Sequence, residues 1–125
     1  MRILLASAIL LATATAACAQ TPAAPAAPPP PSFDVPSTPT TVYIARRNLK
    51  AGENVGLHTH AGEEMTQVIS GDVELTVEGK STVYHGGQSF MVARGAKHDA
   101  KAVTEAVLAV TYVLDKGAPL RTAVP

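Results

Sequence analysis

Two histidines and two carboxylates fall within a few positions of one another in the stretch GLHTHAGEEM, residues 56–65. Imidazole nitrogens and carboxylate oxygens are ligands that divalent first-row transition metals accept in proteins. On a β-strand, His58 and His60 point to the same face with Cα atoms about 6.6 Å apart, so both rings can reach one ion. On a helix the same spacing turns them nearly opposite ways. An extended backbone here therefore predicts a metal site.

The spacing leaves the carboxylate and the fourth ligand open. If the chain stays extended through residues 61–62, alternation places Glu64 on the histidine face and Glu63 on the other, whereas a turn there breaks the count. A further nitrogen must come from His85 or His98, the remaining histidines. His85 stands beside two glycines in an expected turn, and His98 opens an extended stretch. Alternation cannot choose between them, because they lie on separate segments.

The elements that must position these residues are predicted to be short β-strands. Val73, Leu75 and Val77 alternate with polar residues, and a Gly-Lys turn follows at residues 79–80. The expected strands are 41–45, 65–70, 72–78, 82–84, 89–93, 97–104 and 106–114. The last is mostly apolar and suggests a strand buried on both faces. Short strands at even spacing indicate a sandwich or barrel, so we expect an all-β body.

The N-terminal residues have the layout of a secretory signal peptide. Arg2 precedes the apolar run 3–12, and small residues follow up to residues 17–19, ahead of a cut before Gln20. The run is too short to span a bilayer comfortably. Residues 1–19 are therefore predicted to be removed. We expect a bacterial protein of the periplasm or a secreted one, without a membrane span in its mature form.

Cys18 is the only cysteine, which excludes an intrachain disulfide. It follows a weak version of the bacterial lipoprotein signal, with Thr15 where leucine is preferred. Lipid anchoring at Cys18 is the minor alternative to its loss with the signal peptide.

The rest of the chain divides by composition. Eight of the ten prolines fall in residues 21–39, so residues 20–40 are predicted to be a Pro/Ala-rich disordered linker. The domain is expected at residues 41–120, with a tail at 121–125. The formal net charge is zero, and no basic stripe indicates nucleic acid as a partner. A domain this small often needs a metal or a second subunit, so we expect a homodimer.

Two longer stretches resemble the motifs of the cupin superfamily. GENVGLHTHAGEEMTQVISG, residues 52–71, is similar to the first motif, and GQSFMVARGAKH, residues 87–98, is similar to the second. Ala93 stands where the family usually has proline, and Ala102 where it often has asparagine. The short gap between the motifs is similar to that of small single-domain (type-2) cupins. The resemblance implies a double-stranded β-helix, a jelly-roll barrel, that commonly forms dimers. The ligands it implies are His58, His60, Glu64 and His98.

Three imidazoles and one carboxylate leave two positions open on an octahedral ion. The ion can then polarise an oxygenated substrate or activate dioxygen. One divalent first-row transition metal is expected as the cofactor, and these ligands suit Cu, Zn, Fe, Ni or Mn. If the chain acquires its ion after export, the Irving–Williams order favours Cu or Zn.

Two classes of function fit these observations. The resemblance implies a metal-dependent enzyme, such as a quercetinase-like dioxygenase or a related oxygenase, isomerase or decarboxylase, acting on a small chelating oxygenated compound. The alternative is a non-catalytic module of the bacterial envelope that holds a metal or a small ligand. The scarcity of polar residues expected in the pocket favours the alternative, whereas the complete ligand set with open positions favours the enzyme. The expected pocket walls are apolar: Val68, Val73, Leu75, Phe90, Val92 and Leu108. The polar residues that could face inward or lie at its mouth are Tyr43, Thr66, Gln67, Arg94, Lys97 and Tyr112.

Overall fold

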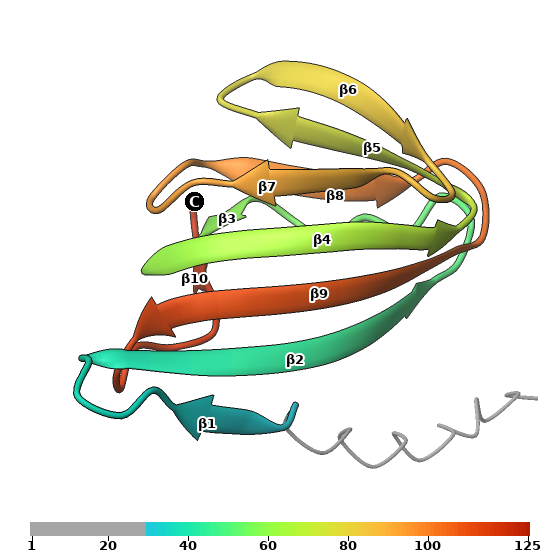
Figure 1. Cartoon of the computed structure of the whole chain (residues 1–125). Helices are drawn as coiled ribbons and strands as arrows, with labels where there is room; N and C mark the ends of the chain where they lie inside the picture. Colours follow the sequence, from blue (N-terminus) through green and yellow to red (C-terminus); the bar gives the residue numbers. More distant parts are fainter. Residues whose placement is uncertain (1–29) are drawn as a thin grey trace, which may run out of the picture.

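Two five-stranded antiparallel sheets make up residues 30–125, the part of the chain that the computed structural model describes. Their strand orders are β1-β2-β9-β4-β7 and β10-β3-β8-β5-β6 (Figure 1). The strands are β1 (Ser32–Asp34), β2 (Thr40–Leu49), β3 (His58–Thr59), β4 (Gly62–Ser70), β5 (Asp72–Val77), β6 (Lys80–His85), β7 (Ser89–Val92), β8 (His98–Ala102), β9 (Ala106–Asp115) and β10 (Thr122–Ala123). No helix forms within residues 30–125, and none there could cross a membrane. The expected all-β class is confirmed.

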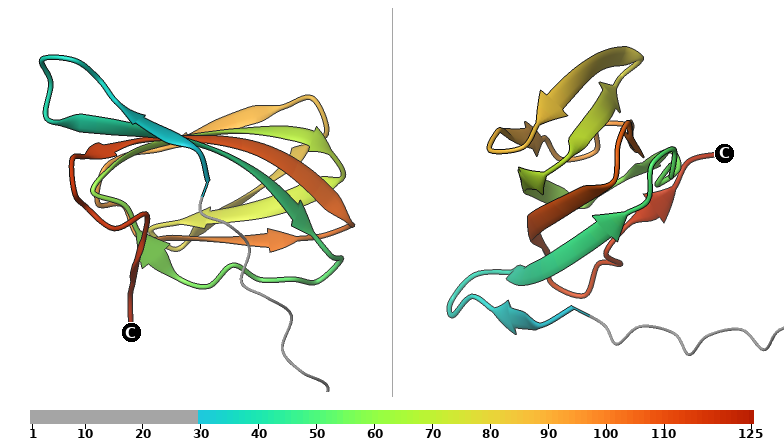
Figure 2. Two further views of the ribbon diagram at one scale, coloured as in Figure 1. Left: turned by 90° about the horizontal axis from the view of Figure 1, so that it is seen from below. Right: turned by 90° about the vertical axis from the view of Figure 1, so that its right-hand side faces the viewer.

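The two sheets face each other as layers of a jelly-roll barrel (Figure 2). Alternation along each strand sends one set of side chains into the space between them. Val73 and Leu75 of β5, for example, are buried, while Glu74 between them is partly exposed. The buried apolar side chains form one core: Leu49, Val68, Val73, Leu75, Phe90, Val92, Ala100, Ala102, Ala106, Leu108, Val110, Tyr112 and Leu114.

Strand β9 corrects one expectation. It was expected to be buried on both faces because residues 106–114 are mostly apolar. Instead, Leu108, Val110 and Tyr112 are buried, whereas Ala109 is exposed and Thr111 is partly exposed. The outer face of this sheet has no second layer over it within residues 30–125, so β9 is buried on its inner face alone.

Strand pairing extends beyond residues 41–120 at both ends. Before them, β1 pairs with β2, and Asp34 is held by Lys116 at 2.7 Å and by the Thr41 hydroxyl at 2.6 Å. After them, β10 pairs with β3, the strand that begins at His58. The signal peptide expected at 1–19 and residues 20–29 of the expected linker lie outside the described residues.

Candidate metal centre

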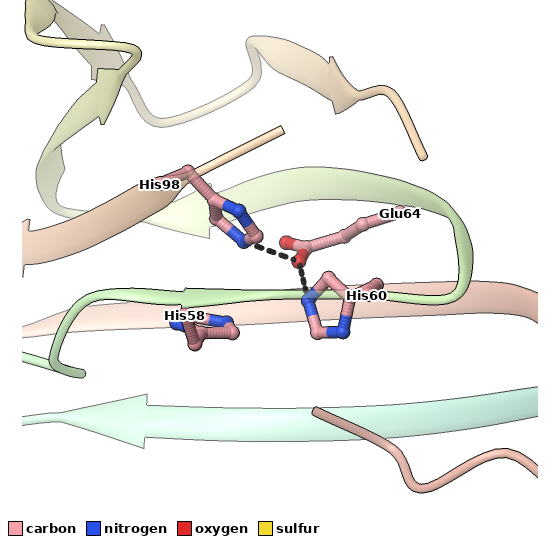
Figure 3. A group of neighbouring side chains, drawn as sticks. All are labelled: His58, His60, Glu64 and His98. Atoms are coloured by element: carbon pink, nitrogen blue, oxygen red, sulfur yellow. Dashed lines mark hydrogen bonds and ion pairs between the residues drawn. The ribbon is translucent and has the colours of Figure 1, made fainter. Parts of the chain in front are cut away.

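Four side chains from three separate segments meet inside the barrel. His58 begins β3 and His60 follows it, Glu64 lies on β4 of the opposite sheet, and His98 begins β8. All four are buried, His98 to 1% exposure. They point toward one another in Figure 3.

The strand pairing explains why they converge. His58 lies directly opposite His98 in the β3–β8 pair. The backbone then crosses to the other sheet, where Glu64 lies opposite Tyr112, a buried residue of β9. Glu64 therefore faces the interior, and Glu63 faces outward and is partly exposed. Alternation through residues 61–62 had favoured this carboxylate.

Gly62 permits the crossing, because β4 there runs very close to β9. A Cβ atom at Gly62 would overlap the carbonyl oxygen of Val113 and press on the Cα of Leu114. Only glycine fits without moving one of the two strands. Because Gly62 has no side chain, β4 can begin close against β9, and this positions the strand that carries Glu64.

His85, the other histidine considered, is not part of this centre. It ends β6, is exposed, and its Nδ1 lies 2.8 Å from a carboxylate oxygen of Asp72. His98 is the histidine that the fold brings to the other three side chains.

The distances suit a single ion. One ligand atom from each of the four residues lies within 4.8 Å of every other. Ligands on opposite sides of an ion with bonds of about 2.1 Å are about 4.2 Å apart, so small side-chain rotations close the gap. The ring centroid of His58 lies 4.8 Å from that of His60 and 4.2 Å from that of His98. The arrangement can therefore hold one ion.

Each imidazole is oriented by a backbone carbonyl. Nδ1 of His58 lies 2.6 Å from the oxygen of Gly56, Nδ1 of His60 lies 2.6 Å from that of Leu120, and Nδ1 of His98 lies 3.0 Å from that of Ala96. A carbonyl can only accept, so each Nδ1 carries the proton and donates it. In the neutral rings, all three Nε2 atoms then present lone pairs to the centre, as metal-binding histidines do.

These lone pairs face a carboxylate. Whether an ion fits can be judged from these contacts between nitrogen and oxygen atoms. Nε2 of His60 lies 2.9 Å from Oε2 of Glu64, and Nε2 of His98 lies 3.4 Å from the same oxygen. The buried Nε2 of His98 has no hydrogen-bond partner within residues 30–125. Acceptors that face acceptors repel, and doubly protonated rings would set three positive charges against one carboxylate. One divalent cation resolves both conflicts, so these residues fit a metal ion.

The electrostatics keep the carboxylate ionised. Burial raises the pKa of Glu64, but the nearby His60 and His98 rings and the hydrogen bond from Thr66 outweigh it and bring the pKa to about 2. The Thr66 hydroxyl donates to Oε1 at 2.7 Å, which leaves Oε2 toward the histidines. Glu64 therefore carries its negative charge at any physiological pH.

The two histidines of the facing pair shift in opposite directions. Burial lowers the pKa of His58 below the ordinary value of 6.5. Burial also lowers the pKa of His98, but its contacts with Glu64 and the Ala96 carbonyl outweigh this and raise it above 6.5. His98 is thus the first of this pair to take up a proton.

A cavity adjoins three of the four side chains, those of His58, Glu64 and His98. Its atom-free space is about 380 Å³, including the part that is open to solvent. It is lined by Arg47, Leu49, Val55, His58, Glu64, Phe90, His98, Ala100, Leu108, Val110 and Tyr112. All six expected wall residues are buried, but only Phe90 and Leu108 line this cavity.

The polar candidates divide between inside and outside. Thr66 and Tyr112 are buried, whereas Gln67 is exposed. Tyr43 is partly buried and packs against the core. Arg94 and Lys97 are both exposed. Arg94 is paired with Asp115 at 2.6 and 2.8 Å and does not line the cavity.

Two contributors were missed by the sequence reasoning. Arg47 was overlooked because the first strand was expected to end at residue 45, although alternation from Tyr43 would have placed it on the inner face. The carbonyl of Leu120, which accepts from His60, could not be foreseen, since backbone contacts between distant segments leave no sequence signal.

A family profile described as "Cupin domain" matches residues 45–114, which include all four candidate ligands. A comparison with curated proteins finds no match.

Several solved structures share the fold. An RmlC-like cupin from Shewanella frigidimarina is 18% identical with a TM-score of 0.57, over 70% of this chain and 86% of that one. An oxalate oxidase is 26% identical with a TM-score of 0.58, over 67% of this chain and 46% of that one. A salicylate 1,2-dioxygenase from Pseudaminobacter salicylatoxidans is 22% identical with a TM-score of 0.52, over 58% of this chain and 20% of that one.

Proposed function

Because the chain belongs to the cupin family, as the match over residues 45–114 establishes, we propose that it is a metal-dependent enzyme. His58, His60, Glu64 and His98 would bind one divalent first-row transition-metal ion. The substrate would be a small chelating oxygenated compound. The observation that carries this proposal is the set of Nε2 lone pairs turned toward Glu64 in a buried site.

The bound ion would supply Lewis acidity, and with a redox-active metal also oxygen chemistry, at two positions that the four ligands leave free. The protein's own residues would orient the substrate and exclude water. Phe90, Leu108 and Val110 give the cavity apolar walls, and Tyr112 closes one side beside His60 at a ring distance of 5.0 Å. Apolar walls that exclude water lower the local dielectric constant, and this strengthens electrostatic interactions inside the cavity.

Dioxygenase-like chemistry, including the quercetinase-like type, is the first reaction class to test. Two of the similar structures carry the names oxalate oxidase and salicylate 1,2-dioxygenase, which supports oxygen chemistry on a small oxygenated compound.

The experiment joins metal content with turnover. Purified protein would be analysed for bound ions, and oxygen uptake followed with flavonols, β-diketones and small hydroxy acids. Glu64→Gln and His98→Ala should lose both the ion and the turnover. His85→Ala, which changes an exposed histidine, should keep both. Equal turnover in the wild type and in all three variants would refute the proposal that the chain is a metal-dependent enzyme.

The alternative is a non-catalytic envelope module that holds a metal or a small ligand. It is favoured by one observation: apart from the candidate ligands, the cavity is lined by no carboxylate or histidine that could act as a general base. Retention of a tightly bound ion in the wild type without turnover of any compound in the panel would support it.

For the ion itself we propose Cu or Zn, because the affinity order for such ligands places these two above Mn and Fe when supply is equal. Fe, Ni and Mn suit the same donors. Elemental analysis of protein isolated from its own cell compartment tests this, and chiefly Mn would count against it.

We also propose that the chain is exported. The support is the pattern of residues 1–19, a positive start, an apolar run and small residues before Gln20. Mass spectrometry of the mature N-terminus in fractionated cells should find Gln20 first, in the periplasm or the medium. A lipid-modified Cys18 in the membrane fraction would instead support anchoring.

A homodimer is the expected assembly. The outer face of the sheet containing β2, β9, β4 and β7 exposes Phe33 (56%), Ile44 (53%) and Met91 (69%). Ile44 and Met91 lie in one row across these strands, joined by Thr111 and Met65. A second copy could cover this row. Light scattering of the mature chain should give a dimer, and Ile44→Glu should give a monomer; a wild-type monomer would refute the assembly.

A further inference from the structure

One positive charge in the interior is not explained by the four candidate ligands. Arg47 lies on β2 opposite Leu108 of β9, and Leu108 is buried, so the register directs Arg47 to the inner face. Its neighbour Arg46 is exposed on the outer face. The Arg47 side chain is partly buried and lines the same cavity as the candidate ligands His58, Glu64 and His98.

Arg47 forms no ion pair within residues 30–125. Other cations there do: Arg94 pairs with Asp115, and Lys116 pairs with Asp34. A guanidinium beside apolar walls loses part of its hydration, and no carboxylate of the described residues compensates it. The cavity thus contains an unmatched cation with its donors free for a ligand.

Arg47 and three of the candidate ligands line one cavity, so a ligand that fills it can contact both. Glu64 is opposite Tyr112, and Arg47 is opposite Leu108, four residues earlier on β9, or about 13 Å along the strand. This separation is between backbone positions, and both side chains line the cavity.

From this placement we propose that the cavity takes a small chelating ligand with a carboxylate group, and that Arg47 binds this carboxylate. The inference rests on the proposed metal function. A divalent ion, the Glu64 carboxylate, three neutral imidazoles and Arg47 sum to two positive charges in one cavity. An anionic ligand neutralises them, whereas an uncharged one leaves them unbalanced. The guanidinium can also bind a carboxylate through two parallel hydrogen bonds.

The test measures ligand binding by calorimetry on the zinc-loaded mature chain, so that no turnover is needed. The probes are malonate and succinate, with malonamide and succinamide as uncharged analogues of the same length. Wild type should bind at least one diacid tenfold or more tightly than its diamide. Arg47→Gln should lose this preference while its zinc content stays at that of the wild type.

Two further variants separate this role from a general effect. Arg46→Gln removes the neighbouring outward charge and should bind like wild type. Arg47→Lys keeps the charge without the planar fork and should retain part of the preference, which also shows that changes at this position do not prevent folding.

The outcomes distinguish the inference from its premise. A chain that holds zinc yet binds diacid and diamide alike, or in which Arg47→Gln behaves as wild type, overturns the carboxylate assignment and leaves the metal centre intact. A wild-type chain that binds no zinc overturns both.

Discussion

His58 and His98 lie directly opposite each other on β3 and β8, with ring centroids 4.2 Å apart. The two residues come from distant parts of the sequence, so their meeting depends on the pairing of β3 with β8 in one sheet. Their Nε2 atoms face the same point as those of His60 and the carboxylate of Glu64. The consequences of this arrangement can be measured without knowing the substrate.

Removal of His98 should abolish tight ion binding. His98→Ala deletes a ligand that is 1% exposed and leaves a void that water would have to fill. We expect the affinity for Zn²⁺ to fall roughly 100-fold or more, since even residues that only support a ligand account for about 10–100-fold. Chelator competition measures this. His85→Ala is the control, and an equal loss in both variants would contradict a centre built on His98.

Thr66 should act through Glu64 without touching the ion. Its hydroxyl donates to Oε1 of Glu64 at 2.7 Å, and Thr66→Val keeps the shape while removing the donor. Zn²⁺ affinity should fall about 10-fold, and the ion-free protein should lose about 1–3 kcal/mol of unfolding free energy. Thr76→Val, which removes an exposed contact with Ser81, is the control. Unchanged affinity in Thr66→Val would show that this hydroxyl does not position the carboxylate.

Alternation predicted much of this centre because the backbone is extended where it matters. It placed His58 and His60 on one face and favoured Glu64 over Glu63, and Glu64 does face the interior although the chain bends at Ala61 and crosses to the other sheet. The choice of His98 over His85 came from the resemblance, and the register of β3 and β8 accounts for it. No pattern within one strand contains that information.

The same alternation failed where strand length or environment was misjudged. Arg47 was missed because β2 continues to Leu49, four residues beyond the expected end. β9 was expected to be covered on both faces because its outward residues are also apolar. Apolar character alone does not say whether another layer is present, and that depends on the sheet order.

Acid should weaken ion binding in two stages. The pKa of His98 is raised above 6.5 and that of His58 is lowered below it. A proton on either Nε2 excludes the ion, so affinity should fall about tenfold per pH unit once the pH drops below the pKa of His98. A steeper fall should begin only below 6.5, when His58 is also protonated. Competition titrations between pH 5 and 8 measure this, and a constant affinity would contradict it.

In the ion-free protein, protonation of His98 should stabilise the fold, whereas it weakens ion binding. Because its folded pKa is above the unfolded value, its contribution to stability is present below pH 6.5 and is lost as the pH rises through the folded pKa. The pKa of His58 is lowered, so its protonation destabilises the folded protein at low pH and opposes the effect of His98. The gain in thermal stability on adding Zn²⁺ should therefore grow from pH 6 to pH 8. A gain that shrinks over this range would contradict the assignment.

Gly62→Ala should destabilise the fold and disturb the centre together. The added Cβ would overlap the Val113 carbonyl, and overpacking of this kind costs about 1–3 kcal/mol or more. Gly79→Ala is the control, because its φ of +79° is strained for alanine but its Cβ meets nothing within 4 Å. Chemical denaturation should show a loss in both variants, and only Gly62→Ala should also lose ion affinity. Equal ion affinity in Gly62→Ala and Gly79→Ala would show that the start of β4 tolerates a side chain.

The C-terminal segment should be needed to orient His60. Its Nδ1 donates to the carbonyl of Leu120 at 2.6 Å, and Arg121 is itself anchored to the Val55 carbonyl at 3.0 Å. Ending the chain after Pro119 removes the Leu120 carbonyl, whereas ending it after Arg121 keeps this carbonyl and removes only the residues of β10 and beyond. The shorter chain should bind Zn²⁺ about 10–100-fold more weakly than the longer one.

Both truncations lose the pairing of β10 with β3, so their difference reports on Leu120 and Arg121, which provide the carbonyl contact with His60, the packing of Leu120 and the bond to Val55. A carbonyl that receives the Nδ1 proton fixes the ring and leaves Nε2 unprotonated toward the ion. Without it, the ring can rotate or take the other tautomer, and the ion loses one of its three nitrogens. If the two truncated chains bind Zn²⁺ equally, the orientation of His60 must come from its packing against Tyr112 instead.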